Sequence, residues 1–286
     1  MASWLAQIGH RPTIVLVSRT SFIQGAALLW LRAYGATAMK VPGHDAAAPA
    51  DMSALMAEMQ RSLPALHGMW HAAGVLADGL VVKQDASTLR RTFGPKAGGA
   101  WNLHQAHAGV ALCTCVYFSS IAGLLGAAGQ ANYASANACL DTLASDRRAQ
   151  GSKAASVVWG PWTEVGMASG GAINSRMGAI GLGLIDLWQG IAMLEATAAA
   201  YRLSVVSFCL VRWEVMLPPS KRAPTLLRTL APRGGPPSFA TTAAHVMRAR
   251  RGAMLGLEAV LDMVRRTAGS TVDADAPLME AGLDSL

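Results

Sequence analysis

The sequence predicts an α/β protein built on a mostly parallel sheet with helices on both faces. Short apolar runs rich in β-branched residues alternate along the chain with longer alanine-rich stretches, as strands and helices do in such a fold. Apolar residues make up 52% of the 286 residues, so a sizeable core can be buried. This length is sufficient for one large domain and a smaller piece beside it.

Each expected element lies between turn-forming residues. The expected strands are Thr13–Val17, Ala36–Val41, Gly68–His71, Val110–Phe118, Ser156–Trp159 and Leu203–Phe208. The expected helices are Ala50–Leu63, Ala86–His107, Asn132–Gln150 and Leu187–Ala199. Because helices separate most of these strands, the strands are expected to be parallel.

The composition changes after Trp213. Between Pro218 and Pro237 the chain holds six prolines, two adjacent glycines and several basic residues, a composition typical of a linker. A last helix is expected over about Ala243–Thr267, followed by a polar loop. We therefore divide the chain into a large domain (residues 1–217), a linker (218–242) and a terminal piece (243–286).

Charge and composition exclude several classes of protein. The net charge of +7 comes from scattered basic residues with few aromatic residues between them, so we expect no nucleic-acid binding. No run of about 18 apolar residues predicts a membrane span, and the N-terminus lacks a secretory signal pattern. The four cysteines have no metal-ligand spacing and no disulfide framework. We expect a cytoplasmic protein without a metal site.

One pair of segments combines a serine, a tyrosine and an asparagine at a spacing that is typical of an active site. Ser120 ends a strand 13 residues before Tyr133, which begins a helix, and Asn137 follows one helical turn later. Hydride delivery to a ketone builds negative charge on the carbonyl oxygen, which then needs donors and a proton. A phenol supplies that proton readily only if a neighbouring cation stabilises the phenolate.

These residues resemble the short-chain dehydrogenase/reductase family, and within it the ketoreductase domains of modular (type I) polyketide synthases. Most family members have Lys where this chain has Asn137, whereas these ketoreductases have Asn there and their Lys on the preceding helix. The resemblance implies a Rossmann-like doubly wound sheet. It also implies that Tyr133 is the acid, that Ser120 holds the substrate oxygen and that Lys96 lowers the tyrosine pKa and contacts the nicotinamide ribose. Asn137 would support proton relay, and Ser119 is the alternative to Ser120.

The resemblance also implies where the cofactor binds. Ser18 and Arg19 end the strand at which family members select the cofactor, and an Arg there pairs with a 2′-phosphate, so NADPH is expected. Asp45 matches the residue beside the adenine. The backbone of the turn after the fourth family strand approaches the cofactor closely, and here this turn consists of His71, Ala72, Ala73 and Gly74. The turn after the sixth family strand adjoins the nicotinamide, and here it contains Pro161. The segment from Gly166 to Gly181 is expected to be a lid over the substrate.

Both ends of the chain depart from a complete family domain. Ser3–Gly9 resembles the end of the helix that follows the family's first strand and Gly-rich turn, and neither precedes it here. We expect a truncated ketoreductase domain that lacks this central strand. The terminal Gly282–Leu286 resembles the start of an acyl carrier domain, with Ser285 as the attachment site of 4′-phosphopantetheine. The terminal piece is thus expected to be a partial carrier domain.

The expected function is NADPH-dependent reduction of a β-ketoacyl thioester, held on an acyl carrier domain, in polyketide or fatty-acid-like biosynthesis. The expected partners are that carrier domain and other polyketide synthase domains. In the family, an Asp at the position of Asp78 accompanies the D-hydroxyl (B-type) product, and Leu125 stands where the opposite (A-type) outcome has Trp. Two alternatives remain: a stand-alone reductase of a small ketone, and an inactive fragment that only contacts carrier partners.

Overall fold

The structure is a computed structural model, and it describes residues 12–19, 36–163, 177–199, 203–218 and 223–231. All of these belong to the first of two compact units, Met1–Ala231. The carrier-like segment, most of the linker, Ser3–Gly9 and most of the expected lid lie outside the described residues. No described helix has both the length and the apolar character that a membrane span requires. Within the described ranges, no group of three His, Cys, Asp or Glu residues is placed to hold a metal ion.

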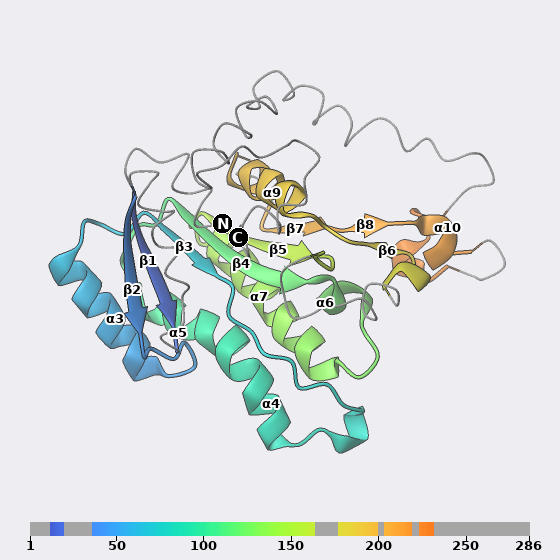
Figure 1. The fold of residues 1–286 in the computed structure, drawn as a ribbon, viewed down its shortest axis with the longest axis horizontal. Helices are drawn as coiled ribbons and strands as arrows, with labels where there is room; N and C mark the ends of the chain where they lie inside the picture. Colours follow the sequence, from blue (N-terminus) through green and yellow to red (C-terminus); the bar gives the residue numbers. More distant parts are fainter. Residues whose placement is uncertain (1–11, 20–35, 164–176, 200–202, 219–222, 232–286) are drawn as a thin grey trace, which may run out of the picture. The chain divides into compact units, whose positions relative to one another are not determined.

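A four-stranded parallel sheet forms the centre of the fold (Figure 1). Its strands occur in the order β3 (Gly68–His71), β4 (Thr114–Ser120), β5 (Ala154–Trp159) and β7 (Val205–Phe208). His71 is in register with Tyr117, and Ser120 with Trp159, so the carboxyl ends of the strands share one edge. This sheet, with its parallel strands, is the one predicted from the sequence.

Two further strands, β1 (Thr13–Ser18) and β2 (Thr37–Pro42), form a separate parallel pair. Among the described residues, no strand pairs with the outer side of β1 or of β3. In a doubly wound sheet these two open edges would be the neighbours of one central strand.

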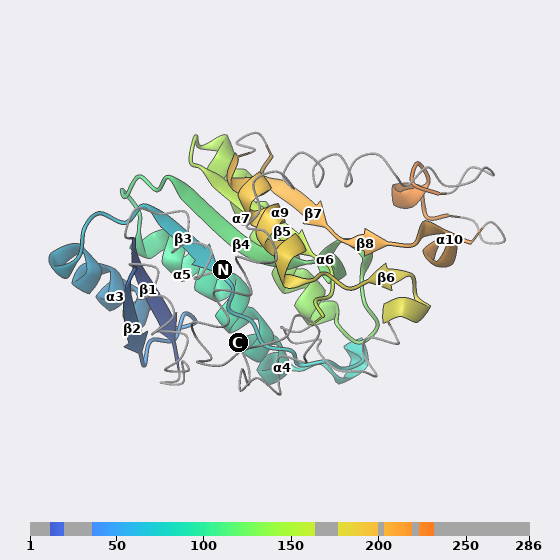
Figure 2. The ribbon, with the colours of Figure 1, turned by 45° about the horizontal axis from the view of Figure 1, so that its top comes forward.

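Helices cover both faces of the sheet (Figure 2). On one face, Leu194 of α9 (Leu187–Ala199) packs with Val116, Val157 and Trp159. On the other, Ala100 and Leu140 pack with Tyr117. These two side chains come from α5 (Gly99–Ala106) and α7 (Ala131–Ala149). Successive residues of β4 thus face opposite layers, as the pleat requires.

The expected helix Ala86–His107 is wrong in one respect that matters for the site. It is divided into α4 (Ala86–Phe93), a π-helical turn labelled η2 (Gly94–Gly98) and α5. Pro95 has no amide hydrogen to donate, and π turns are often found at functional sites. The turn contains Lys96, so the direction of that side chain differs from the one that a continuous α-helix would give it.

The remaining differences are at element ends and in short elements. Strand β4 begins at Thr114 instead of Val110, because a tight turn with Gly109 at a φ of 86° precedes it. The strand Gly68–His71 and the helix Leu187–Ala199 have the predicted bounds, and α3 (Pro49–Ser62) has nearly its expected ones. Six short elements were not predicted from the sequence: η1 (Val81–Lys83), α6 (Ile121–Leu125), β6 (Leu182–Gly183), β8 (Leu210–Val211), α10 (Trp213–Met216) and η3 (Thr225–Leu227).

Candidate active site

The expected catalytic residues meet at the carboxyl end of β4 and the start of α7. The Lys96 ammonium donates a hydrogen bond of 2.9 Å to the Phe118 carbonyl and lies 5.3 Å from the centroid of the Tyr133 ring. The Asn137 amide donates to the Tyr133 carbonyl at 2.8 Å, one helical turn back. Tyr133, Lys96 and Asn137 are all buried. Three elements distant in sequence thus bring these groups together.

The two candidate serines have different surroundings. Ser120 caps α6, where its Oγ accepts a hydrogen bond from the Ala122 amide, and its hydroxyl is near enough to the Tyr133 hydroxyl to lower the pKa of that phenol. Ser119 is buried, and its Oγ lies 3.4 Å from the Asn137 carbonyl, to which it donates. Only Ser120 therefore combines access to the tyrosine hydroxyl with a position at the strand end.

Burial sets the charge state of Lys96. Desolvation lowers the pKa of its ammonium from 10.5 to about 8, and the negative charge of Asp141 opposes that shift. The side chain is therefore mostly cationic near neutral pH. A cation held this close to a tyrosine ring is available to stabilise the phenolate.

The Tyr133 hydroxyl is a weaker acid than a solvated phenol in this structure. Burial raises its pKa above the ordinary value of 10, hydrogen bonding with Asn137 and Ser120 lowers it, and the charge of Asp78 raises it further. Tyr133 thus stays protonated at neutral pH. It can still protonate an alkoxide, which is a much stronger base than a phenolate.

A buried polar group behind the site was missed by sequence reasoning. The Ser156 hydroxyl on β5 donates to Asp141 Oδ1 at 2.6 Å. Burial raises the pKa of Asp141, whereas the hydrogen bond from Ser156, the neighbouring Ser119 hydroxyl and the charge of Lys96 lower it. Asp141 lies two helical turns after Tyr133, so helical spacing from the tyrosine could have indicated it.

The loop that contains Asp78 is tied to the start of α7. Gln130 Nε2 donates to Asp78 Oδ2 at 2.9 Å, and Asn132 Nδ2 donates to the Ala77 carbonyl at 2.8 Å. The Gly79 amide donates to the Gly129 carbonyl, also at 2.8 Å. The loop is thereby placed next to Tyr133, although the Asp78 side chain itself is exposed.

The expected cofactor residues follow the carboxyl ends of the strands. Ser18 is the last residue of β1, the exposed Arg19 follows it, and Pro161 is the second residue after β5. Asp45 follows β2, and its carboxylate accepts a hydrogen bond of 2.9 Å from the Ala47 amide. Ligands of doubly wound sheets bind along this edge.

His71 differs from the expectation. It ends β3, but its side chain is only 4% exposed and is occupied by a contact with the main chain of Lys96. Ala72, Ala73 and Gly74 follow without regular structure and are more accessible. These three residues are therefore accessible at the turn, whereas the His71 imidazole contacts the Lys96 main chain.

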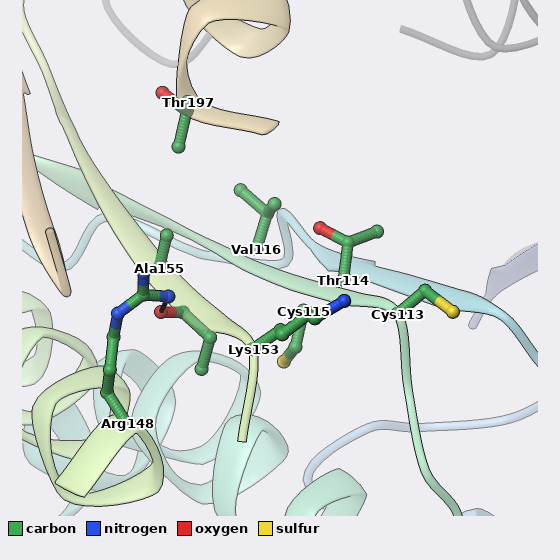
Figure 3. A pocket seen from close by; sticks show the side chains of 9 residues that line it. Cys113, Thr114, Cys115, Val116, Arg148, Lys153, Ala155 and Thr197 are labelled. Atoms are coloured by element: carbon green, nitrogen blue, oxygen red, sulfur yellow. Dashed lines mark hydrogen bonds between the residues drawn. The ribbon is translucent and has the colours of Figure 1, made fainter. Parts of the chain in front are cut away.

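A small pocket lies at the other end of the sheet (Figure 3). Figure 3 shows Thr197 on one side of the sheet and Arg148 on the other, near the amino ends of β4 and β5. None of the expected catalytic residues lines it. It is not the candidate active site.

The described residues fit a nicotinamide dinucleotide at the carboxyl edge. The described residues include two cations, Arg19 after β1 and Lys96 beside β4, and the small residues of the turn after β3. An arginine can pair with a phosphate, and a lysine can donate hydrogen bonds to the hydroxyls of a ribose. Small residues let the backbone of the turn approach the cofactor closely. Arg19 would hold the adenosine side and Lys96 the nicotinamide side.

Comparison with known proteins agrees with this class of site. The sequence model of the KR domain family matches residues 1–164. The chain is 36% identical over 277 residues to the spectinabilin polyketide synthase system protein NorB of Streptomyces orinoci, covering 90% of this chain and 12% of that protein. It is 33% identical over 299 residues to a phenolphthiocerol/phthiocerol polyketide synthase protein of Mycobacterium tuberculosis, covering 100% of this chain and 13% of that protein.

Solved structures give the same result. An A-type ketoreductase from a modular polyketide synthase matches with a TM-score of 0.74 and 33% identity, over 80% of this chain and 49% of that one. The ketoreductase from the first module of phoslactomycin biosynthesis in Streptomyces sp. HK803 matches with a TM-score of 0.70 and 35% identity, over 79% and 53% of the two chains.

The fold and the site define a reductase of the short-chain dehydrogenase/reductase class, which uses a nicotinamide cofactor. More particularly, the chain belongs to the KR domain family, the ketoreductase domains of polyketide synthases. It spans about one eighth of the length of the two polyketide synthase proteins that it matches.

Proposed function

We infer that this chain reduces a β-ketoacyl thioester on an acyl carrier domain to the β-hydroxyacyl thioester, with NADPH as the reductant. The observation that supports this most is the convergence of Tyr133, Lys96 and Asn137 beside Ser120. The matches to polyketide synthases support polyketide biosynthesis as the setting. The other domains of such a synthase would be its partners.

Bound NADPH supplies the hydride that reduces the carbonyl carbon. The Ser120 hydroxyl donates a hydrogen bond to the carbonyl oxygen and stabilises the charge that develops there. The Tyr133 O–H bond breaks as the new O–H bond of the alcohol forms, which leaves a phenolate. The Lys96 cation stabilises that phenolate, and Asn137 orients the tyrosine through its hydrogen bonds.

The carrier domain is the proposed source of the substrate. Ser285 would be the attachment site of 4′-phosphopantetheine if the terminal segment is part of a complete carrier domain. A stand-alone reductase and an inactive fragment are the two competing functions. The complete proton-transfer group argues against the inactive fragment, and Asn137 and the carrier-like terminal segment argue against the stand-alone reductase.

A comparison of two substrates separates these functions. The natural polypeptide that includes residues 1–286, whatever its full length, is supplied with NADPH and an acetoacetyl group. The group is presented either on a carrier domain or on N-acetylcysteamine. We expect a higher kcat/KM for the carrier-bound group. Equal values would favour a stand-alone reductase, and no NADPH oxidation with either would favour the inactive fragment.

Arg19 is expected to select NADPH over NADH. Its guanidinium follows β1 and is exposed, so it is free to approach a 2′-phosphate. Arg19→Ala should weaken NADPH binding by roughly one to two decades, since a charged hydrogen bond is worth about 1.5–3 kcal/mol, and should change NADH binding little. Fluorescence titration with both cofactors measures this, with Arg91→Ala, another exposed arginine, as the control. Equal losses for both cofactors would make Arg19 structural.

Asp78 is expected to accompany a D-hydroxyl product. Its loop is fixed to Gln130 and Asn132, beside Tyr133, so an acidic group borders the substrate site. One similar structure is described as an A-type ketoreductase, and that description applies to that protein. In this chain, Leu125 occupies the position at which the A-type is expected to have Trp. Chiral chromatography of the reduced thioester should give mainly the D-alcohol. Mainly L-alcohol would show that Asp78 has no part in stereocontrol.

A further inference from the structure

The main chain of Lys96 makes a contact that the proposed mechanism does not use. The His71 Nε2 atom lies 2.9 Å from the Lys96 carbonyl oxygen, across 25 residues of sequence. Both side chains are almost fully buried, with 4% and 3% of their surfaces exposed. A hydrogen bond in such surroundings is costly to lose, because water cannot replace the missing partner.

The carbonyl oxygen fixes which imidazole nitrogen has the proton. A carbonyl only accepts hydrogen bonds, so Nε2 must be the donor. Burial lowers the pKa of His71 from 6.5 to about 4, and the nearby Lys96 charge lowers it as well, although the hydrogen bond to the Lys96 carbonyl acts in the opposite direction. The ring is therefore neutral at physiological pH, with its proton on Nε2.

The imidazole is also held by packing. Its ring meets the Tyr117 ring edge to face, with centroids 6.5 Å apart. On another side it touches Gly99, where an added Cβ would lie 3.0 Å from His71 Cε1 and 2.9 Å from the Ala46 Cβ. Gly99 directly follows the π turn, so a glycine at this position lets the turn approach His71 closely.

Lys96 is thus held at both of its ends by two adjacent strands. At one end, His71 on β3 binds its carbonyl; at the other, Phe118 on β4 accepts from its ammonium. His71 is in register with Tyr117, the residue before Phe118. The spacing between these strands therefore fixes where the ammonium lies relative to Tyr133.

We propose that His71 is a positioning residue for Lys96, acting through the Lys96 carbonyl, and that its imidazole does not bind the cofactor. The proposal rests on the proposed role of Lys96 in reduction. Without the imidazole donor, the π turn loses its attachment to β3. The lysine side chain then leaves its buried position beside Tyr133 for solvent. The groups that face the ammonium are Tyr133 and Asp141 from α7 and the Phe118 carbonyl from β4. The neutral His71 from β3 contacts the carbonyl at the other end of the residue.

Three variants test this in the natural polypeptide. His71→Leu removes the donor and keeps an apolar side chain, whereas His71→Gln keeps an N–H at a similar reach. His107→Leu is the matched control, since His107 is equally buried and makes its hydrogen bond to the neighbouring His104 carbonyl. The His107→Leu variant therefore shows the effect of general destabilisation alone.

The first measurement does not depend on activity. Lys96 is labelled with an amine-reactive ester over a range of pH and quantified by peptide mass spectrometry, with the exposed Lys83 as internal reference. In His71→Leu we expect labelling of Lys96 to be at least tenfold faster above about pH 10.4, where much of its amine is neutral in either protein, and its apparent pKa to move toward the ordinary value near 10.4. In His71→Gln and His107→Leu, Lys96 should label as in the wild type.

The second measurement is reduction of acetoacetyl-N-acetylcysteamine. His71→Leu should lower kcat roughly tenfold or more, and His71→Gln should restore most of it. Unchanged Lys96 labelling in His71→Leu, or the same change in His107→Leu, would overturn the proposal. If Lys96→Met itself reduced the thioester normally, the proposed function would fail, whatever the labelling showed. The two failures are therefore distinguishable.

Discussion

Tyr133→Phe should lower the rate of thioester reduction about 10²- to 10⁴-fold, the range expected for loss of a general acid. Binding of NADPH should change little, because the substitution removes only the hydroxyl that protonates the alkoxide. The Tyr133 ring, which is buried and faces the Lys96 ammonium, remains in place. Single-turnover kinetics, together with fluorescence titration of NADPH, measures both quantities.

Tyr117→Phe is the matched control for this substitution. Tyr117 is a fully buried tyrosine on β4 that packs toward α5 and α7. Removal of its hydroxyl should leave the rate of reduction within a few-fold of the wild type. A Tyr133→Phe variant that reduced substrate at the wild-type rate would show that another group donates the proton.

Lys96→Met should have the second-largest effect, a loss of about 10²-fold or more in kcat together with weaker NADPH binding. Removal of one stabilising donor from an active site typically costs 10²- to 10³-fold. The residue is also the expected contact of the nicotinamide ribose, so both binding and reaction should be impaired. Lys83→Met, an exposed lysine in η1, is the control and should retain normal activity.

The pH dependence of the wild type follows from the same residue. Desolvation lowers the pKa of Lys96 to about 8, so its stabilising cation is present below that pH and is lost as the pH rises through it. The kcat/KM for the thioester should therefore fall on the alkaline side of about pH 8. A profile that stays flat to pH 10 would contradict a role for the Lys96 cation.

The parallel sheet could be predicted because its strands are short apolar runs and because longer helical stretches separate most of them along the chain. The interruption at Gly94–Gly98 could not, since helical periodicity continues on both sides of the π turn. The choice of Gly at position 99 is explained only by the three-dimensional approach of His71 and Ala46.

The catalytic group was predictable because Ser120, Tyr133 and Asn137 are close in sequence and their spacing reflects one strand and one helix. The residues behind this group could not be predicted in the same way. Ser156 and Asp141 come from a different strand and from later turns of α7, and their contact depends on how the helix packs on the sheet. The sequence predicted His71 as the last residue of its strand, but its side-chain contact depends on the π turn.

Transfer of deuterium from NADPH labelled at C4 tests the central claim most directly. The natural polypeptide that contains residues 1–286 is supplied with each C4-deuterated epimer of the cofactor and a β-ketoacyl carrier domain, and the product is analysed by mass spectrometry. One epimer should place a single deuterium on the β-carbon of the hydroxyacyl group, and Tyr133→Phe should prevent it. A product without deuterium from either epimer, or no product from the wild type, would contradict the account.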